Sequence, residues 1–175
     1  MDPWLRFALI FAFLGISSEL FYYAILLGSP MLEVYLEGIA IVSGAILNLL
    51  GQEVDVLGTS IWNGHFMVDI APECDAVQLC TLLASAILAF PAPWRSKAVG
   101  ILTNIALLQA VNFIRVVSLY IIGAQYSEDT FHTAHLVIWP GILIVAVVTM
   151  WVNWARRVGR EADDEQVRQV DAFPS

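Results

Sequence analysis

Residues 97–122 read KAVGILTNIALLQAVNFIRVVSLYII, an apolar run that contains one charged residue far from either end, Arg115. A helix needs about 20 mostly apolar residues to cross the roughly 30 Å hydrocarbon core of a bilayer. Because the bilayer offers no water to unpaired backbone groups, a spanning segment of this kind is expected to be helical. The stretch therefore predicts a membrane-spanning helix that carries a cation.

Four further stretches are apolar enough to be interpreted in the same way. They cover about Leu5–Leu27, Leu32–Leu50, Ala76–Phe90 and Thr133–Ala155. The stretch before Phe90 is short, and must take in residues from Cys74 onward to reach full length. The whole chain is 59% hydrophobic and 14% charged, with a mean hydropathy of +0.74, whereas soluble domains are about 45–50% apolar and about 25% charged.

The predicted fold class is therefore an all-α polytopic membrane protein with about five transmembrane helices. Residues 1–155 are expected to form a single transmembrane domain. Residues 156–175 are polar and acidic, and are expected to form a disordered cytoplasmic tail.

The charges and cysteines exclude several classes of function. Eight Lys and Arg against sixteen Asp and Glu give no basic surface for a nucleic acid. Two cysteines cannot form a four-thiolate metal site, and the paired ligands of an H-E-x-x-H metalloprotease are absent from the sequence. Cys74 and Cys80 lack the C-x-x-C spacing of a thiol–disulfide oxidoreductase. No metal and no cofactor are expected.

The basic residues predict the orientation, because short cytoplasmic loops collect Lys and Arg. They cluster before the fourth stretch and after the fifth, at Arg95, Lys97, Arg156, Arg157 and Arg160. Residues 51–72 and 123–132 contain no Lys or Arg and are expected outside. Five crossings then place the N-terminus outside as well, against the single charge of Arg6.

A small extracytoplasmic β-hairpin is predicted before the third helix. Valines 54 and 56 alternate with polar residues, as do the apolar residues 66, 68 and 70. Asn63-Gly64 lies between the two runs and is a strong hairpin signal, since both residues accept a positive φ. Pro72 ends the second strand and suits the entry to a helix. Cys74 is therefore placed at the outer N-terminus of the third helix.

Cys74 begins a polar face on that helix. At about 100° per residue, Cys74, Gln78, Thr81 and Ser85 fall within about 40° of one another. A helix N-terminus favours the thiolate, whereas the carboxylates on either side of Cys74 oppose it. A lone cysteine is more often a small buried hydrophobe, but its place at the start of a polar face makes Cys74 a candidate nucleophile.

Arg115 lies about 10 Å inside the outer end of the fourth helix. A charge at this depth is costly and usually functional. Gln109, Asn112 and Ser118 recur beside it at every third position. This ridge favours a packed interior site over a side chain that reaches the interface.

Two histidines compete for a role near the outer start of the fifth helix. His132 and His135 share a helical face with Trp139, so periodicity cannot choose between them. His132 follows a polar loop, whereas His135 lies one turn deeper, with Trp139 a further turn below it. Depth therefore favours His135, which would lie with Cys74 and Arg115 in the outer half of the bilayer.

Three blocks, Pro72-Glu73-Cys74, Asn112-x-x-Arg115 and His135 before Trp139, together resemble the signatures of the exosortase/archaeosortase family. The resemblance covers about residues 45–155, and the short chain resembles a compact member of the exosortase H type. One departure is that the family commonly has Ser or Asn and then Gly after the cysteine, where this chain has Asp75 and Ala76.

The resemblance implies a membrane cysteine protease or transpeptidase with Cys74 as nucleophile, Arg115 as catalytic partner and His135 as acid–base residue. Its partners would be membrane-anchored proteins with a C-terminal sorting signal, made of a Pro-containing motif, a transmembrane helix and a basic tail. Cleavage would proceed through a thioester acyl-enzyme, in the plasma (inner) membrane, at an active site facing the extracytoplasmic side. The expected supporting residues are Asn112, Gln78, Thr81, Trp139 and His132.

An alternative function remains open at the level of the sequence. Arg115, Glu19 and Glu37 could be intramembrane charges on the pathway of a small transporter or channel subunit. That function predicts that Cys74 can be replaced without loss of activity.

Overall fold

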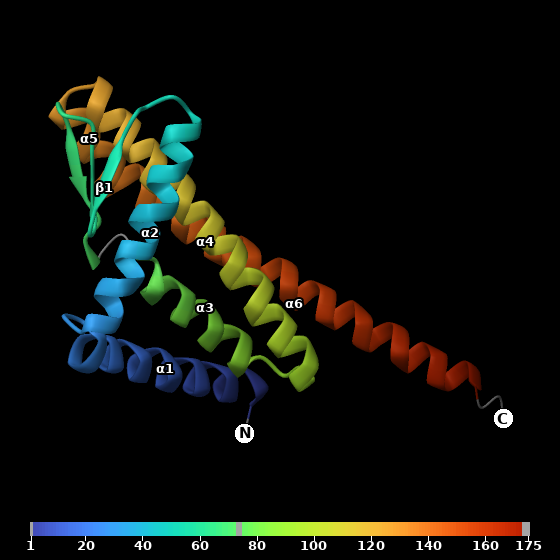
Figure 1. Cartoon of the computed structure of the whole chain (residues 1–175). Helices are drawn as coiled ribbons and strands as arrows, with labels where there is room; N and C mark the ends of the chain where they lie inside the picture. Colours follow the sequence, from blue (N-terminus) through green and yellow to red (C-terminus); the bar gives the residue numbers. More distant parts are fainter. Residues whose placement is uncertain (1, 73–74, 173–175) are drawn as a thin grey trace.

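The computed structural model describes residues 2–72 and 75–172, without the side chains of 162, 163 and 165–172. The chain is a bundle of helices with a small sheet at one end (Figure 1). Its helical elements are α1 (Pro3–Phe21), η1 (Tyr22–Leu26), α2 (Pro30–Leu49), α3 (Val77–Ala89), α4 (Trp94–Gln125), α5 (Glu128–Thr133), η3 (Ala134–Ile138) and α6 (Trp139–Ala172). Its strands are β1 (Asp55–Leu57), β2 (Ser60–Trp62) and β3 (Met67–Asp69). The predicted all-α polytopic membrane fold is confirmed.

Four helical segments are long and apolar enough to cross a membrane, whereas the sequence predicted about five. They are Pro3–Leu26, Pro30–Leu49, Trp94–Gln125 and Glu128–Glu161. The third predicted span is α3, which has 13 residues and a length of about 20 Å at 1.5 Å per residue. It does not extend back toward Cys74, because Ala76 leaves the helical conformation with a φ of 58°. At its other end, Pro91 and Pro93 prevent α3 and α4 from joining.

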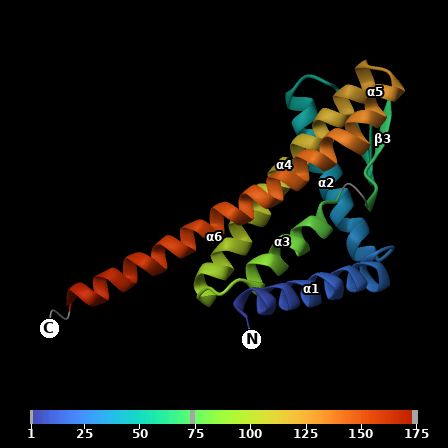
Figure 2. The ribbon, with the colours of Figure 1, turned by 180° about the vertical axis from the view of Figure 1, so that it is seen from behind.

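The path of α1 corrects the predicted position of the N-terminus. α1 runs antiparallel to α3. Gln78 near the start of α3 donates to Glu19 near the end of α1, and Phe7 lies against Trp151 of α6, with ring centroids 5.9 Å apart, while Trp151 also contacts Phe90 at the end of α3. The N-terminus thus lies at the same end of the bundle as the α3–α4 loop, and both views show this arrangement (Figures 1 and 2). The sequence placed these two on opposite sides, because it treated α1 and α2 as a pair of opposite crossings. Arg6 consequently joins the other basic residues instead of opposing them.

α2 continues from the end of α1 toward the sheet and does not return along the bundle. Tyr35, early in α2, bonds to Gln109 of α4, and Asn48 at its far end bonds to the backbone of Val54 before the sheet. α2 therefore runs beside the half of α4 that follows Gln109. A core made of this half of α4, α2 and the sheet includes the fully buried Ile61 and Tyr120.

The sheet is a three-stranded antiparallel meander in the order β1-β2-β3, and not the two-stranded hairpin that was predicted. The turn at Asn63-Gly64 does connect two strands, β2 and β3. The extra strand arises because Gly58, with a φ of 60°, allows the chain to reverse between β1 and β2. Phe66 then packs on Gly123 of α4, where a Cβ atom would lie 2.2 Å from the phenyl ring. This contact fixes the sheet on the end of α4.

α6 is much longer than the span predicted from the sequence. It continues through Arg160 to Ala172, so the acidic segment for which the composition favoured disorder is helical in the structure. It projects beyond the bundle on the side of the α3–α4 loop (Figures 1 and 2). Helix propagation costs less than nucleation, so a helix formed within the bundle extends into a segment free of Pro.

Candidate functional site

A cavity of about 220 Å³ lies where α3, α4 and α6 meet. Its lining includes Asp75, Gln78, Arg115 and Pro140. The Arg115 side chain is only 5% exposed, although it carries a permanent charge. Cys74 lies outside the described residues, but the residue that follows it, Asp75, forms part of the cavity wall. The structure therefore brings Arg115 and the start of α3 to one cavity, whereas His135, the third residue expected there, is not among the described residues that line it.

Asp75 is held by hydrogen bonds from three directions. Its Oδ2 accepts from the Tyr22 hydroxyl at 2.8 Å, and its Oδ1 accepts from the backbone N–H of Val77 at 2.7 Å. The Tyr35 hydroxyl donates to its backbone carbonyl at 3.1 Å, and Gln109 donates to that hydroxyl. Asp75 itself is buried. The helices η1, α2 and α4 thus fix the backbone immediately after Cys74.

Tyr22 and Tyr35 were not predicted from the sequence, in which Asp75 stands out only as a departure from the family pattern. A signal was present, because tyrosines inside apolar helices usually bring their hydroxyl to a partner. The sequence could not identify that partner, since Tyr22 and Asp75 are 53 positions apart.

Ala76 adopts a left-handed backbone conformation, with φ 58° and ψ 8°. This conformation costs a residue with a Cβ atom about 1–2 kcal/mol, whereas glycine adopts it freely. Glycine is the residue that the family resemblance leads one to expect at this position. The departure at Ala76 therefore preserves the backbone shape at the cost of local strain.

Replacing Ala76 by glycine is expected to raise the free energy of unfolding by up to about 1 kcal/mol. Relief of strain of about 1–2 kcal/mol outweighs the loss of one buried methyl group, worth about 0.8 kcal/mol. Ala40→Gly is the matched control, because Ala40 is fully buried within the helix α2. It should destabilise the protein by about 1 kcal/mol or more. Thermal unfolding in detergent measures both changes, and equal losses in the two variants would show that Ala76 is not strained.

The two histidines lie in different surroundings. His132 is exposed, and its Nε2 lies 3.6 Å from a carboxylate oxygen of Glu128, one turn earlier in α5. His135 is half-buried, with its ring centroid 5.7 Å from that of Phe131. The exposures agree with the depth argument that separated the two residues in the sequence.

His135 lies in η3, a single turn of π-helix in which the N–H of Trp139 donates to the carbonyl of Ala134. Pro140 follows at once and has no N–H with which to continue the normal helical pattern. Turns of this type widen a helix and are frequent at functional sites. The other π-helical turn among the described residues, η1, holds Tyr22 against Asp75. η1 thus contacts the start of α3 directly, and η3 lies just before Pro140, which lines the cavity together with Asp75.

The other residues predicted to support the site lie in different surroundings. Asn112 is fully buried on α4, one turn before Arg115. Gln78 lines the cavity and donates to Glu19 of α1 at 3.0 Å. Thr81 instead donates to the carbonyl of Gln78 within its own helix, and Trp139 packs with Leu119 in a small apolar cluster.

The described side chains at and around the cavity carry polar groups that can take part in chemistry. Among residues 2–72 and 75–172, no group of three or more His, Cys, Asp and Glu side chains is placed to hold a metal ion. Arg115 supplies N–H donors that can stabilise an anion at the cavity. His135 supplies an imidazole on a neighbouring element, which can transfer protons near neutral pH.

Comparison with known proteins assigns the chain to a family. The family model for transmembrane exosortases (Exosortase_EpsH) matches residues 3–159, which is most of the chain. No curated protein and no solved structure matches this chain. Together with the apolar helices, the family match makes this a multi-pass membrane protein, and the chain belongs to the transmembrane exosortase family.

Proposed function

We propose that this protein is a membrane-embedded cysteine protease or transpeptidase that cleaves C-terminal sorting signals of exported proteins. Membership of the exosortase family indicates the general role. The observation that carries the specific proposal is the buried Arg115, which lines one cavity together with Asp75, the neighbour of Cys74. A buried permanent cation at a cavity is expected where negative charge develops during a reaction.

The proposed reaction has two steps. In the first, His135 accepts the thiol proton of Cys74 and the sulfur attacks the scissile carbonyl of the substrate. Arg115 stabilises the negative charge on the carbonyl oxygen. The C–N bond then breaks, the leaving amine receives the proton from His135, and a thioester remains on Cys74. In the second step, water or an acceptor amine attacks the thioester and regenerates the thiol.

Trapping the thioester tests this proposal. Incubating the purified protein with a sorting-signal peptide that carries an N-terminal tag should leave the tag on Cys74, in a bond that hydroxylamine cleaves. Cys74→Ala should abolish both labelling and cleavage. Cys80→Ala is the control, because Cys80 is a half-buried residue of α3 that packs in an apolar cluster. Full activity of the Cys74→Ala protein would refute the peptidase proposal and favour a transporter.

We further propose that the end of the bundle with the α3–α4 loop faces the cytoplasm and that the sheet and α5 face outward. Arg95 and Lys97 lie in the first turn of α4, and Arg157 lines a cavity together with Arg95. Arg6 is near the start of α1, at the same end of the bundle. The positive-inside rule therefore favours this end as the cytoplasmic side. The cavity beside Arg115 then lies nearer the extracytoplasmic side, and α6 ends in the cytoplasm.

Single cysteines introduced into a Cys74→Ser/Cys80→Ala background test this orientation. Cysteines at Asp2 and Ser96 should react with a membrane-impermeant maleimide only after the membrane is permeabilised. A cysteine at Ser127 should react in intact cells. Labelling of the Asp2 position from outside, with Ser96 protected, would contradict the antiparallel arrangement of α1 and α3.

A further inference from the structure

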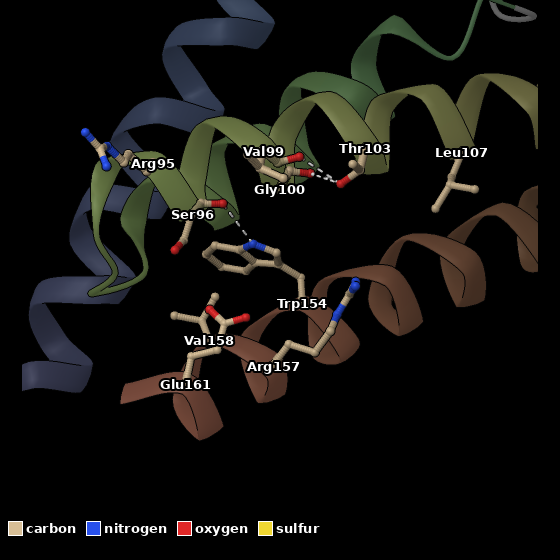
Figure 3. A pocket seen from close by; sticks show the side chains of 10 residues that line it. All are labelled: Arg95, Ser96, Val99, Gly100, Thr103, Leu107, Trp154, Arg157, Val158 and Glu161. Atoms are coloured by element: carbon tan, nitrogen blue, oxygen red, sulfur yellow. Dashed lines mark hydrogen bonds between the residues drawn. The ribbon is translucent and has the colours of Figure 1, made fainter. Parts of the chain in front are cut away.

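A second cavity, of about 370 Å³, separates α4 from α6 at the end of the bundle with the α3–α4 loop (Figure 3). Trp154 forms its floor, and the indole Nε1 donates to the carbonyl of Ser96 at 3.2 Å. Gly100 makes this packing feasible, since a Cβ atom there would lie 2.2 Å from the indole nitrogen. The cavity is therefore shaped by specific packing between the two helices.

Two arginines give this cavity a positive charge. The side chain of Arg157 enters the gap between α6 and α4, whereas Arg95 stands at the edge with its guanidinium turned outward (Figure 3). Glu161 also lines the cavity, so two arginines and one carboxylate contribute to its charge. Among the described side chains the one ion pair is that between Glu128 and His132, so neither arginine is neutralised by a salt bridge there. Both guanidinium groups are thus available to an anion.

The wall of the cavity away from the arginines is apolar and open to the surroundings. Val99 and Leu107 of α4 line it and are 61% and 55% exposed. Thr103 lies between them, but its hydroxyl donates to the carbonyl of Val99 at 2.8 Å. A molecule bound in the cavity would therefore make hydrocarbon contacts with this wall, toward the membrane interior.

We propose that this cavity binds an anionic phospholipid of the leaflet that it faces. The phosphate would bind to Arg157, whose side chain enters the gap, because the planar guanidinium group binds phosphate oxygens through two parallel N–H donors. Arg95 at the edge would attract the phosphate as a second positive charge. One acyl chain would follow Val99 and Leu107 along α4. Basic pockets between transmembrane helices are a recognised setting for anionic headgroups. Free phosphate would leave the apolar wall without a partner, and a cationic peptide would be repelled. This site is remote from the cavity at Arg115 and does not depend on the peptidase proposal.

Lipid binding by the full chain tests the proposal. The protein would be purified in a neutral detergent and titrated with phosphatidylglycerol or phosphatidylcholine, with bound lipid counted by native mass spectrometry. Phosphatidylglycerol should bind preferentially. Arg157→Gln should weaken that binding roughly fivefold, the change expected for one basic side chain near the anionic headgroup. Arg160→Gln is the matched control. It removes the same charge one turn further along α6, at a residue that does not line the cavity. It should change the affinity by less than about twofold.

A second variant tests the cavity itself. Val99→Trp keeps every charge and changes an exposed position, so the protein should fold, but the indole should fill the apolar wall and reduce lipid binding. Inorganic phosphate at millimolar concentration should not displace the lipid. Equal losses in Arg157→Gln and Arg160→Gln would overturn the site in favour of general attraction to basic residues. Displacement by inorganic phosphate, or unchanged binding in Val99→Trp, would overturn its assignment to a phospholipid.

Discussion

Arg115→Lys is expected to lower kcat for cleavage of a sorting-signal substrate by about 100-fold or more. Loss of one preorganised donor to a developing oxyanion typically costs about 10²–10³ in kcat. Lysine keeps the charge but lacks the planar fork of N–H groups, so it cannot reproduce the geometry at the cavity. Because the interaction would be made mainly in the transition state, KM should change little. Arg115→Ala should be at least as inactive.

The Arg115 variants need a control for folding, since the residue is almost completely buried. Thermal unfolding and size-exclusion profiles in detergent should show that the lysine variant remains folded. Arg95→Lys makes the same chemical change at the edge of the remote α4–α6 cavity, and should retain the activity of the wild type. Full activity of Arg115→Lys would show that the residue supplies only positive charge. Oriented N–H donors would then play no part in the reaction.

His135→Ala is expected to lower the rate of cleavage by about 10²–10⁴, the usual contribution of a general acid–base residue. His132→Ala should change the rate by less than about twofold. His132 is exposed, and its ion pair with the surface carboxylate of Glu128 is of a kind that contributes little. His135 is half-buried on the turn that leads into Trp139 and Pro140, and Pro140 lines the cavity.

The two histidine variants control for each other, because they make the same substitution three positions apart. Cleavage of a tagged substrate should be measured at matched expression, together with the yield of thioester on Cys74. An inactive His132→Ala protein with an active His135→Ala protein would exclude His135 as the base. It would transfer the role to the exposed turn of α5.

Local pattern was enough to predict most of the helices and the neighbourhood of the site. Apolar runs of sufficient length marked α1, α2, α4 and α6, since burial in lipid depends on composition over about 20 residues. A charge isolated within such a run identified Arg115, which is indeed buried at a cavity. The sequence also separated His132 from His135, because distance from a polar loop is a local property. Which groups perform catalysis remains a prediction.

The direction of α1 relative to α3 was not available from hydropathy, because lipid-facing helices of the same composition can pair in either sense. It depends on particular contacts, such as those of Glu19 with Gln78 and of Phe7 with Trp151. The strand β2 was missed because Ile61 and Trp62 are apolar in succession and give no alternating pattern; its place is defined by pairing with β1 and β3.

The surroundings of Asp75 depended on tertiary packing most of all. Its carboxylate and carbonyl accept hydrogen bonds from Tyr22 and Tyr35, residues on two elements far away in the chain. Each residue alone is compatible with many partners, and only the folded bundle brings these three together. Hydrophobic burial is non-directional and can be inferred from composition. Hydrogen bonds require specific atoms at about 3 Å with defined angles, so they exist only once the helices have taken their relative positions.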